Sequence, residues 1–204
     1  MENNNISDLN PQNNTLLINP SFPSKVSLSP AVKIAVMASG NGSNFEAIAR
    51  AIESDLLDAK ISILIVNNDD CKAIERAKKL GIHYEYIDHR KFANRNSYDK
   101  KIVSRLKYFN VECIVMAGWM RIVTPILINT FPNKIINIHP SILPSFKGTK
   151  SIERALNSGV KITGCTIHKV IEEIDSGEII AQAAVKIDLE DDLSSLTEKI
   201  QVLE

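Results

Sequence analysis

Short, almost wholly apolar runs alternate with amphipathic stretches along most of this chain, and this alternation is the strongest constraint on its fold. Residues 32–38, 61–66 and 113–117 have the length of strands, and helical spacing of apolar residues follows each of them. Strands that are apolar on both faces must be covered on both faces. Parallel neighbours also need crossover connections, which helices usually supply. The pattern therefore predicts an α/β fold, a mostly parallel sheet with helices on both faces.

The end of the chain departs from this alternation. Only residues 172–177 separate the last two apolar segments, which is too short for a crossover and indicates an antiparallel edge. Further strands are expected at residues 84–87, 134–138, 161–171 and 178–187. Helices are expected at residues 44–54, 72–80, 98–109 and 151–158, with a short one from Thr124-Pro125 and a last one from near Asp192.

Residues 1–30 differ in composition from everything that follows. They contain seven Asn, five Ser and four Pro, with no sustained periodicity, which predicts a disordered tail. The segment lacks the charged start and apolar block of a signal peptide. Residues 31–204 are expected to form one folded domain.

Composition excludes several classes of protein. The 24 basic and 24 acidic residues balance, so no basic field is present to attract nucleic acid. No apolar run approaches the roughly 20 residues that span a bilayer. The three cysteines are far apart and form no C-x-x-C pair, which is typical of small core residues in a reducing cytoplasm. We therefore expect a cytoplasmic protein without a metal, a membrane or a nucleic-acid partner.

The most informative chemical motif is Asn137-Ile138-His139-Pro140-Ser141, at the end of an expected strand. Alternate residues of a strand share a face, so Asn137 and His139 point one way while Ile138 points the other. Pro140 should end the strand. An amide beside a titratable imidazole suits acyl chemistry, because one group can stabilise an oxyanion and the other can move a proton. A histidine at a strand end can equally be structural.

A glycine-rich loop, SGNGSN at residues 39–44, lies between the first expected strand and helix. Glycines let backbone N–H groups approach a ligand, and a helix N-terminus favours an anion. The dinucleotide fingerprint is absent because Phe45 occupies the third glycine position, and no Gly-Lys-Ser/Thr follows. The loop predicts a single phosphate site, and a tight turn capped by Ser43 or Asn44 is the alternative.

Two later loops complete the candidate site. Residues 118–123 (GWMRIV) follow a strand, and ligands of open α/β sheets bind beyond such ends. Trp119 and Met120 can form apolar walls and Arg121 can hold a carboxylate, although an aromatic residue covering a sheet edge beside a solvated Arg fits equally well. Asp175 can orient His139, or it can simply close an Asx turn.

Four segments together resemble the phosphoribosylglycinamide formyltransferases, a family of folate-dependent formyltransferases. They are SGNGSN at 39–44, AGWMRI at 117–122, NIHPSILPSFKG at 137–148 and IDSG at 174–177. The resemblance covers residues 32–204 and implies a Rossmann-like formyltransferase fold. It also implies transfer of a formyl group from the co-substrate 10-formyltetrahydrofolate to glycinamide ribonucleotide in purine synthesis, without a metal or nicotinamide, by a monomer or homodimer.

The resemblance also implies roles for individual residues. The catalytic group would be Asn137, His139 and Asp175. The residues implied for the nucleotide are Gly40, Asn41, Gly42, Ser43, Asn44, Gln201 and Glu204. The residues implied for the folate are Arg95, Met120, Arg121, Ile122, Val123, Asn137, Ile171, Glu172, Glu173 and Ile174. His168, on a strand face with Thr166, is interpreted as a structural histidine.

Some features depart from the family pattern and leave other functions open. Thr149-Lys150 replaces the Leu-His or similar pair of many members, and the resemblance implies further residues after Glu204. A formyltetrahydrofolate hydrolase is similar across the core but carries a regulatory domain and lacks the SGNGSN loop. A methionyl-tRNA formyltransferase would need a further domain and a basic surface. A non-catalytic nucleotide-binding relative is the remaining alternative.

Overall fold

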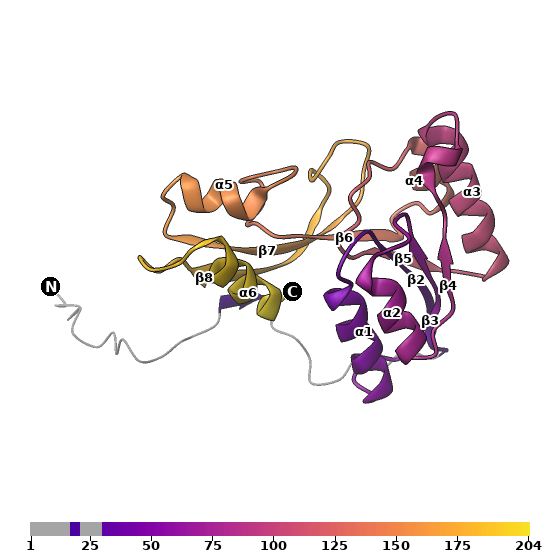
Figure 1. Ribbon diagram of the computed structural model, residues 1–204, viewed down its shortest axis with the longest axis horizontal. Helices are drawn as coiled ribbons and strands as arrows, with labels where there is room; N and C mark the ends of the chain where they lie inside the picture. The colour runs from indigo at the N-terminus through magenta and orange to yellow at the C-terminus, as the bar shows by residue number, and fades with distance from the viewer. Residues whose placement is uncertain (1–16, 21–29) are drawn as a thin grey trace, which may run out of the picture.

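One eight-stranded sheet organises the computed structural model, which describes residues 17–20 and 30–204 (Figure 1). The strand order is β1-β8-β7-β6-β5-β2-β3-β4. The strands are β1 (Leu17–Asn19), β2 (Val32–Ala38), β3 (Ala59–Val66), β4 (Tyr84–Tyr86), β5 (Cys113–Met116), β6 (Ile135–His139), β7 (Ile162–Lys169) and β8 (Ile179–Lys186). The helices are α1 (Ser43–Glu53), α2 (Lys72–Lys79), α3 (Arg95–Tyr108), α4 (Pro125–Thr130), α5 (Ser151–Asn157) and α6 (Leu193–Leu203).

Strand direction divides the sheet into two parts. Strands β2 to β6 pair in parallel, whereas β6–β7, β7–β8 and β1–β8 pair antiparallel. The mostly parallel sheet and its antiparallel edge, predicted from the sequence, are confirmed. The chain builds outward from β2 to β3 and β4, then returns to the other side of β2 with β5 and β6. This reversal creates a switch point at the carboxyl ends of β2 and β5, where ligands of such sheets usually bind.

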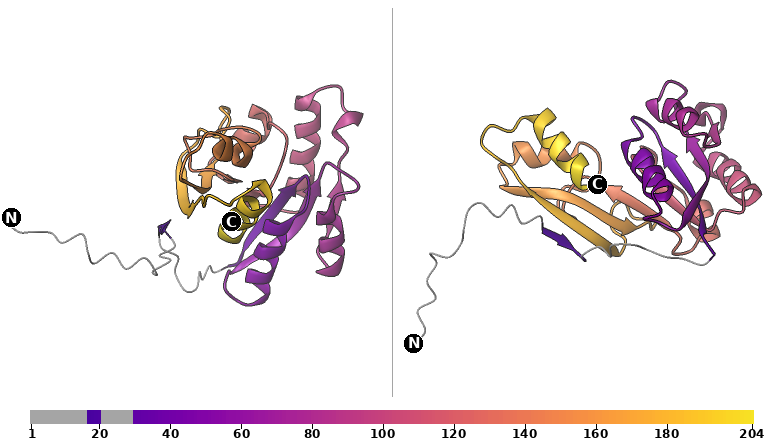
Figure 2. Two further views of the ribbon diagram at one scale, coloured as in Figure 1. Left: turned by 60° about the vertical axis from the view of Figure 1, so that its left-hand side comes forward. Right: turned by 90° about the horizontal axis from the view of Figure 1, so that it is seen from below.

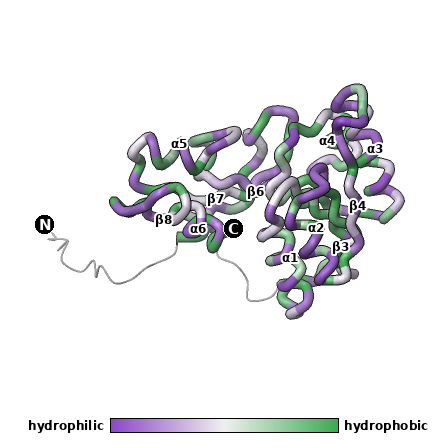
Figure 3. Tube along the Cα trace, in the orientation of Figure 1, coloured by the Kyte–Doolittle hydropathy of each residue, from purple (hydrophilic) through white to green (hydrophobic). Residues whose placement is uncertain are grey.

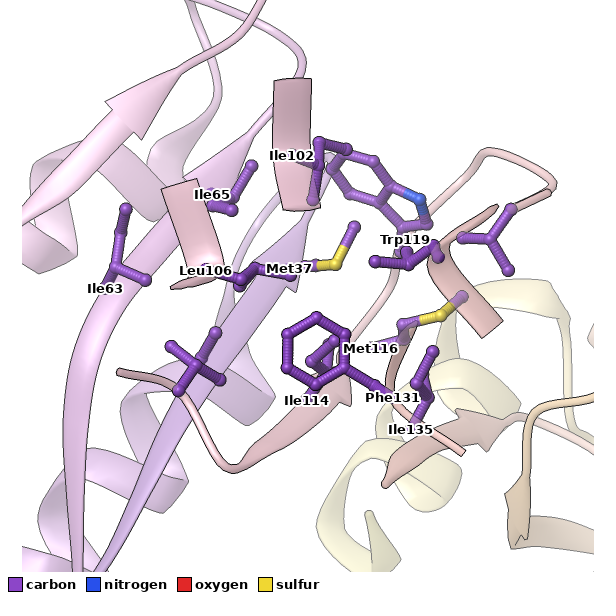
Figure 4. Packing of buried hydrophobic residues seen from close by; sticks show 14 of the residues in the cluster. Met37, Ile63, Ile65, Ile102, Leu106, Ile114, Met116, Trp119, Phe131 and Ile135 are labelled. Atoms are coloured by element: carbon purple, nitrogen blue, oxygen red, sulfur yellow. The ribbon is translucent and has the colours of Figure 1, made fainter. Parts of the chain in front are cut away.

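The two faces of the parallel part are covered by different helices. Phe45 of α1 and Ala73 of α2 pack against Val36 and other residues of one face. On the opposite face, Ile102 and Leu106 of α3 pack with Met37, Trp119 and their neighbours (Figure 4). Figure 3 shows hydrophobic residues gathered along the strands between these helices. Helices on both faces of the sheet are therefore confirmed.

The antiparallel part has a smaller core of its own. Leu196 and Ile200 of α6 are fully buried against Cys165 of β7 and Ala183 of β8. Helix α5 adds two partly buried residues, Ile152 and Leu156, to this cluster. In Figure 2 these elements lie beside the half that carries α1 to α4.

Two details differ from the predictions. Helix α3 begins at Arg95 rather than at residue 98, because Asn94 and Ser97 form a capping box. Of the predicted tail, residues 1–16 and 21–29 lie outside the described residues, but Leu17–Asn19 form the edge strand β1. Pairing with β8, and contact of Ile18 with the core of the antiparallel part, give this short segment a place that its composition does not predict.

Candidate active site

A cavity of about 700 Å³ opens at the carboxyl ends of β2, β5 and β6. Loops from both halves of the sheet line it, together with one face of α6. Of the residues that the sequence predicted for a site, the cavity brings together Gly40, Asn41, Gly42, Ser43, Asn44, Met120, Arg121, Ile122, Val123, Asn137, His139, Ile171, Glu172, Glu173, Ile174, Asp175, Gln201 and Glu204. Segments that are distant in sequence therefore converge on one space.

The carboxylate of Asp175 lies between two imidazole rings. Its Oδ2 is 3.4 Å from Nδ1 of His139, and its Oδ1 is 3.6 Å from Nε2 of His168. The backbone N–H of Gly148 donates a hydrogen bond to Oδ2 at 2.7 Å. The Asp175 side chain is only 10% exposed, so these contacts act with little screening by water. The predicted approach of Asp175 to His139 is present in the structure.

Burial alone would raise the pKa of Asp175, but other interactions outweigh it. Hydrogen bonding from His168 and from the Gly148 N–H, and the charges of both imidazoles, hold the pKa of this carboxyl below its usual range. Asp175 is therefore ionised at neutral pH and can accept or relay a proton.

The orientation of His139 is fixed by a strained loop. Its Nε2 lies 3.0 Å from the carbonyl oxygen of Phe146, which can only accept, so Nε2 carries a proton. The nitrogen that faces Asp175 is Nδ1, 3.4 Å from Oδ2. Phe146 has a φ of 56°, a costly conformation for an aromatic residue, and this turn lies beside the carbonyl that holds the imidazole.

His168 also lines the cavity, a position that the sequence reasoning did not predict. Strand β7 pairs antiparallel with β6 in a register that sets His168 opposite Asn137. The Nδ1–H of His168 donates to its neighbour's carbonyl, Lys169 O, at 2.9 Å, which leaves Nε2 3.1 Å from Nδ2 of Asn137. When Nε2 of His168 carries no proton, it accepts one N–H of Asn137, and the second N–H stays available to a ligand. The signal lay in the pairing of two strands, which a single sequence does not reveal.

The glycine-rich loop enters α1 as predicted, although neither Ser43 nor Asn44 caps the helix. Gly42 is the N-cap, and its φ of 71° is a conformation that favours glycine. Asn44 instead donates a hydrogen bond to Glu204 at 2.9 Å, which joins the loop to the end of α6. Burial raises the pKa of the Glu204 carboxyl, and the bond from Asn44 opposes that shift.

The loop after β5 supplies an apolar wall that is part core and part surface. Trp119 is buried and stacks on Tyr98 at a ring separation of 6.4 Å, whereas Met120 is 75% exposed. The Arg121 guanidinium lies 5.5 Å from the centre of the Tyr98 ring. Ser39 joins this wall to the glycine-rich loop, because its hydroxyl accepts a hydrogen bond from the Met120 N–H at 2.9 Å.

Arg95 does not line the main cavity. It lies in a neighbouring cavity of about 390 Å³, which shares Ile122, Val123 and Glu172 with the main one. A long ligand could therefore extend from one cavity into the other. The structure also adds Lys150, Thr149 and Thr197 to the lining of the main cavity.

Neither a metal centre nor a membrane helix is found in the described part of the chain. No group of three or more His, Cys, Asp and Glu residues among residues 17–20 and 30–204 is placed to hold a metal ion. None of the described helices has the length and apolar character required to cross a bilayer.

A cavity lined by both a glycine-rich loop and an exposed apolar wall can hold two substrates. The ionised carboxylate and the imidazoles line the same cavity, where a proton could move as a group is transferred. These features define a two-substrate group-transfer enzyme. Comparison with known families agrees: residues 32–204 match the model described as Formyl transferase, and the chain belongs to this family.

Individual relatives share much of the chain. It is 40% identical over 172 residues to the phosphoribosylglycinamide formyltransferase of Bacillus subtilis, covering 84% of this chain and 88% of that protein. It is 38% identical over 173 residues to the trifunctional purine biosynthetic protein adenosine-3 of Gallus gallus, covering 85% of this chain but 17% of that protein. Only that part of the trifunctional protein is relevant to this chain.

Solved structures show the same likeness. The phosphoribosylglycinamide formyltransferase of Bacillus halodurans superposes with a TM-score of 0.82 at 40% identity, covering 83% of this chain and 88% of that one. Glycinamide ribonucleotide transformylase 1 of Symbiobacterium toebii gives a TM-score of 0.84 at 33% identity, covering 88% and 86%.

Proposed function

We propose that this chain transfers the formyl group of 10-formyltetrahydrofolate to the amine of glycinamide ribonucleotide in purine synthesis, with residues 31–204 as the catalytic domain. The observation that carries the proposal is the convergence of the two loops predicted to bind ligands on Asn137, His139 and Asp175 in one cavity. The 40% identity to a phosphoribosylglycinamide formyltransferase supports it. The reaction is expected in the cytoplasm, without a metal or nicotinamide, in a monomer or homodimer.

The nucleotide is assigned to the end of the cavity formed by the glycine-rich loop and α6. Backbone N–H groups at the start of α1 suit a phosphate, because they are unpaired donors at the positive end of a helix. Gln201 and Glu204, from the last turns of α6, line the same end and offer partners for sugar hydroxyls.

The folate is assigned to the opposite end. Exposed Met120 and Ile122 provide apolar surface for a ring system. The segment 171–174 lines the same cavity. Arg95 and Arg121 offer positive charge for the carboxylates of the folate tail, Arg95 from the adjoining cavity.

Between the two ends, the attacking amine forms a bond to the formyl carbon, and the carbonyl oxygen becomes negative in a tetrahedral intermediate. Asn137 and protonated His139 donate hydrogen bonds to this oxyanion, and removing such a donor typically costs about 3–4 kcal/mol. Asp175 receives the proton of the amine and, through water, passes it to the departing folate nitrogen as the old C–N bond breaks.

The test is a formyl-transfer assay on the purified chain with both substrates. We expect tetrahydrofolate to form only when glycinamide ribonucleotide is present, and formylated nucleotide to accumulate in equal amount. Replacing His139 with alanine should lower turnover more than about tenfold, a loss above ~1.4 kcal/mol of transition-state stabilisation. Formyl release at the same rate with and without the nucleotide would instead indicate a hydrolase. Nucleotide binding without turnover would indicate a non-catalytic relative.

A further inference from the structure

Arg76, a residue of α2 outside the cavity, holds the glycine-rich loop from behind. Its Nε donates to the carbonyl oxygen of Asn41 at 2.9 Å, and a terminal nitrogen donates to Oδ1 of the same residue at 3.3 Å. The other terminal nitrogen forms an ion pair with Glu46 of α1. One guanidinium therefore joins α2, the loop and α1. Its side chain is 30% exposed, so the contacts are partly shielded from water.

These contacts determine where the backbone donors of the loop point. In a planar trans peptide, the C=O and the following N–H point in opposite directions. Because Arg76 holds the carbonyl of Asn41 towards α2, the N–H of Gly42 is directed away from α2. The carbonyl of Gly40 is held in the same way by the Ala73 N–H at 3.2 Å, so the N–H of Asn41 is directed away as well.

Both N–H groups belong to residues that line the cavity, and no acceptor for either is found within residues 17–20 and 30–204. The loop also has no space to shift towards α2. A Cβ atom added to Gly42 would lie 2.8 Å from the Cβ of Ala73, closer than real side chains come. The loop therefore lies directly on α2, with two consecutive donors facing the cavity and a cation behind them.

We propose that Arg76 is a positioning residue for the nucleotide phosphate: it orients the peptides of the glycine-rich loop so that their N–H groups meet the phosphate. The inference rests on the proposed function, because it takes the phosphate to bind at this loop. Arginine suits the role better than lysine, since its planar fork can hold the Asn41 carbonyl, the Asn41 side chain and Glu46 at once.

The kinetic test compares Arg76→Met with Arg50→Met. Arg50 bonds the same Glu46 carboxylate at 2.6 Å but does not touch Asn41, so it controls for loss of an ion pair. We expect Arg76→Met to raise the KM for glycinamide ribonucleotide about tenfold, with kcat and the folate KM changed less than about twofold. Arg76→Lys should recover only part of this loss, and Arg50→Met should resemble the wild type. Equal KM values in the two methionine variants would overturn the proposal.

A phosphate-free substrate separates positioning from a general structural effect. With glycinamide ribonucleoside, which lacks the phosphate, Arg76→Met should equal the wild type in kcat/KM, because the oriented donors have no phosphate to meet. An equal loss on ribonucleotide and ribonucleoside would contradict the role assigned to Arg76.

A binding measurement keeps this inference distinct from the proposed reaction. Inorganic phosphate is titrated into the isotope-labelled protein while the amide signals of Asn41 and Gly42 are followed by NMR. Both signals should shift in the wild type and in Arg50→Met, with a much weaker apparent affinity in Arg76→Met. If the wild type binds phosphate in this way but transfers no formyl group, the proposed reaction fails and the inference stands. If the amide signals of Asn41 and Gly42 do not shift when phosphate is added to the wild type, the inference fails.

Discussion

Asp175 illustrates at the residue scale how backbone and side chain serve one site. Its φ of 48° is a left-handed conformation that aspartate and asparagine tolerate better than most residues. Asparagine can therefore replace it with the same shape and backbone, but without the charge. The exchange separates the electrostatic contribution of this side chain from its packing.

We expect Asp175→Asn to lower kcat by about 10²–10⁴, the usual range for loss of a positioned proton-transfer group. Nucleotide affinity should stay near the wild-type value, because Asp175 belongs to the connection between β7 and β8 and not to the glycine-rich loop. Steady-state kinetics and nucleotide titration check both points. Glu178→Gln, at the end of the same turn with its side chain 70% exposed, is the matched control. Turnover retained within tenfold in Asp175→Asn would refute the assigned role.

The lowered pKa of Asp175 also predicts a pH dependence of stability. Since its folded-state pKa lies below the ordinary carboxyl value of about 3.9, the charged form stabilises the fold above that pH. This contribution is lost as the pH falls through the folded-state pKa. The difference in unfolding free energy between wild type and Asp175→Asn should therefore become smaller as the pH is lowered from about 5 through the folded-state pKa of Asp175. Urea titrations at a series of pH values measure this difference. A difference that stays constant with pH would contradict the shift.

At the scale of elements, two loops are joined by hydrogen bonds beside the proposed catalytic residues. Nζ of Lys147, in the loop after β6, donates to the Ser176 hydroxyl at 2.6 Å, and that hydroxyl donates to the Ile174 carbonyl at 2.8 Å. The neighbouring Gly148 holds Asp175 from the same loop. The segment proposed to face the folate is thus tied to the loop that orients His139.

Replacing Lys147 with methionine should loosen this connection while keeping the aliphatic stem. We expect the KM for 10-formyltetrahydrofolate to rise about three- to tenfold, in line with loss of a hydrogen bond of roughly 1 kcal/mol, while the nucleotide KM stays unchanged. Steady-state kinetics with each substrate varied in turn provide the measurement. Lys186→Met removes an exposed ion pair to Asp188 and serves as the control. A rise in the nucleotide KM alone would contradict the arrangement.

Local sequence patterns predict most of the helices and strands, but they do not predict which strands pair or in which register. The shared face of Asn137 and His139 follows from strand alternation, so the sequence predicts it. The position of His168 opposite Asn137 depends on the register of β6 and β7, which no local pattern contains. Strand β1 is a similar case, because pairing with a distant edge outweighs an Asn- and Pro-rich composition.

At the scale of the whole molecule, residues from both parts of the sheet line the cavity. Figure 2 shows these two parts side by side. The glycine-rich loop comes from the parallel part, whereas Gln201 and Glu204 belong to α6, which packs on the antiparallel part. The hydrogen bond from Asn44 to Glu204 joins positions 160 residues apart. A nucleotide bound here would contact both parts and so connect them.

We therefore expect glycinamide ribonucleotide to stabilise the fold, by about 2.7 kcal/mol at a free concentration of 100 times its Kd. Asn44→Ala should weaken this effect at the same nucleotide concentration, because it removes the contact that joins the loop to α6. Thermal unfolding followed over a series of nucleotide concentrations measures both. Asn129→Ala, an exposed asparagine of α4 outside the cavity lining, is the control and should retain the full shift. Equal stabilisation of the Asn44 and Asn129 variants would place the nucleotide elsewhere.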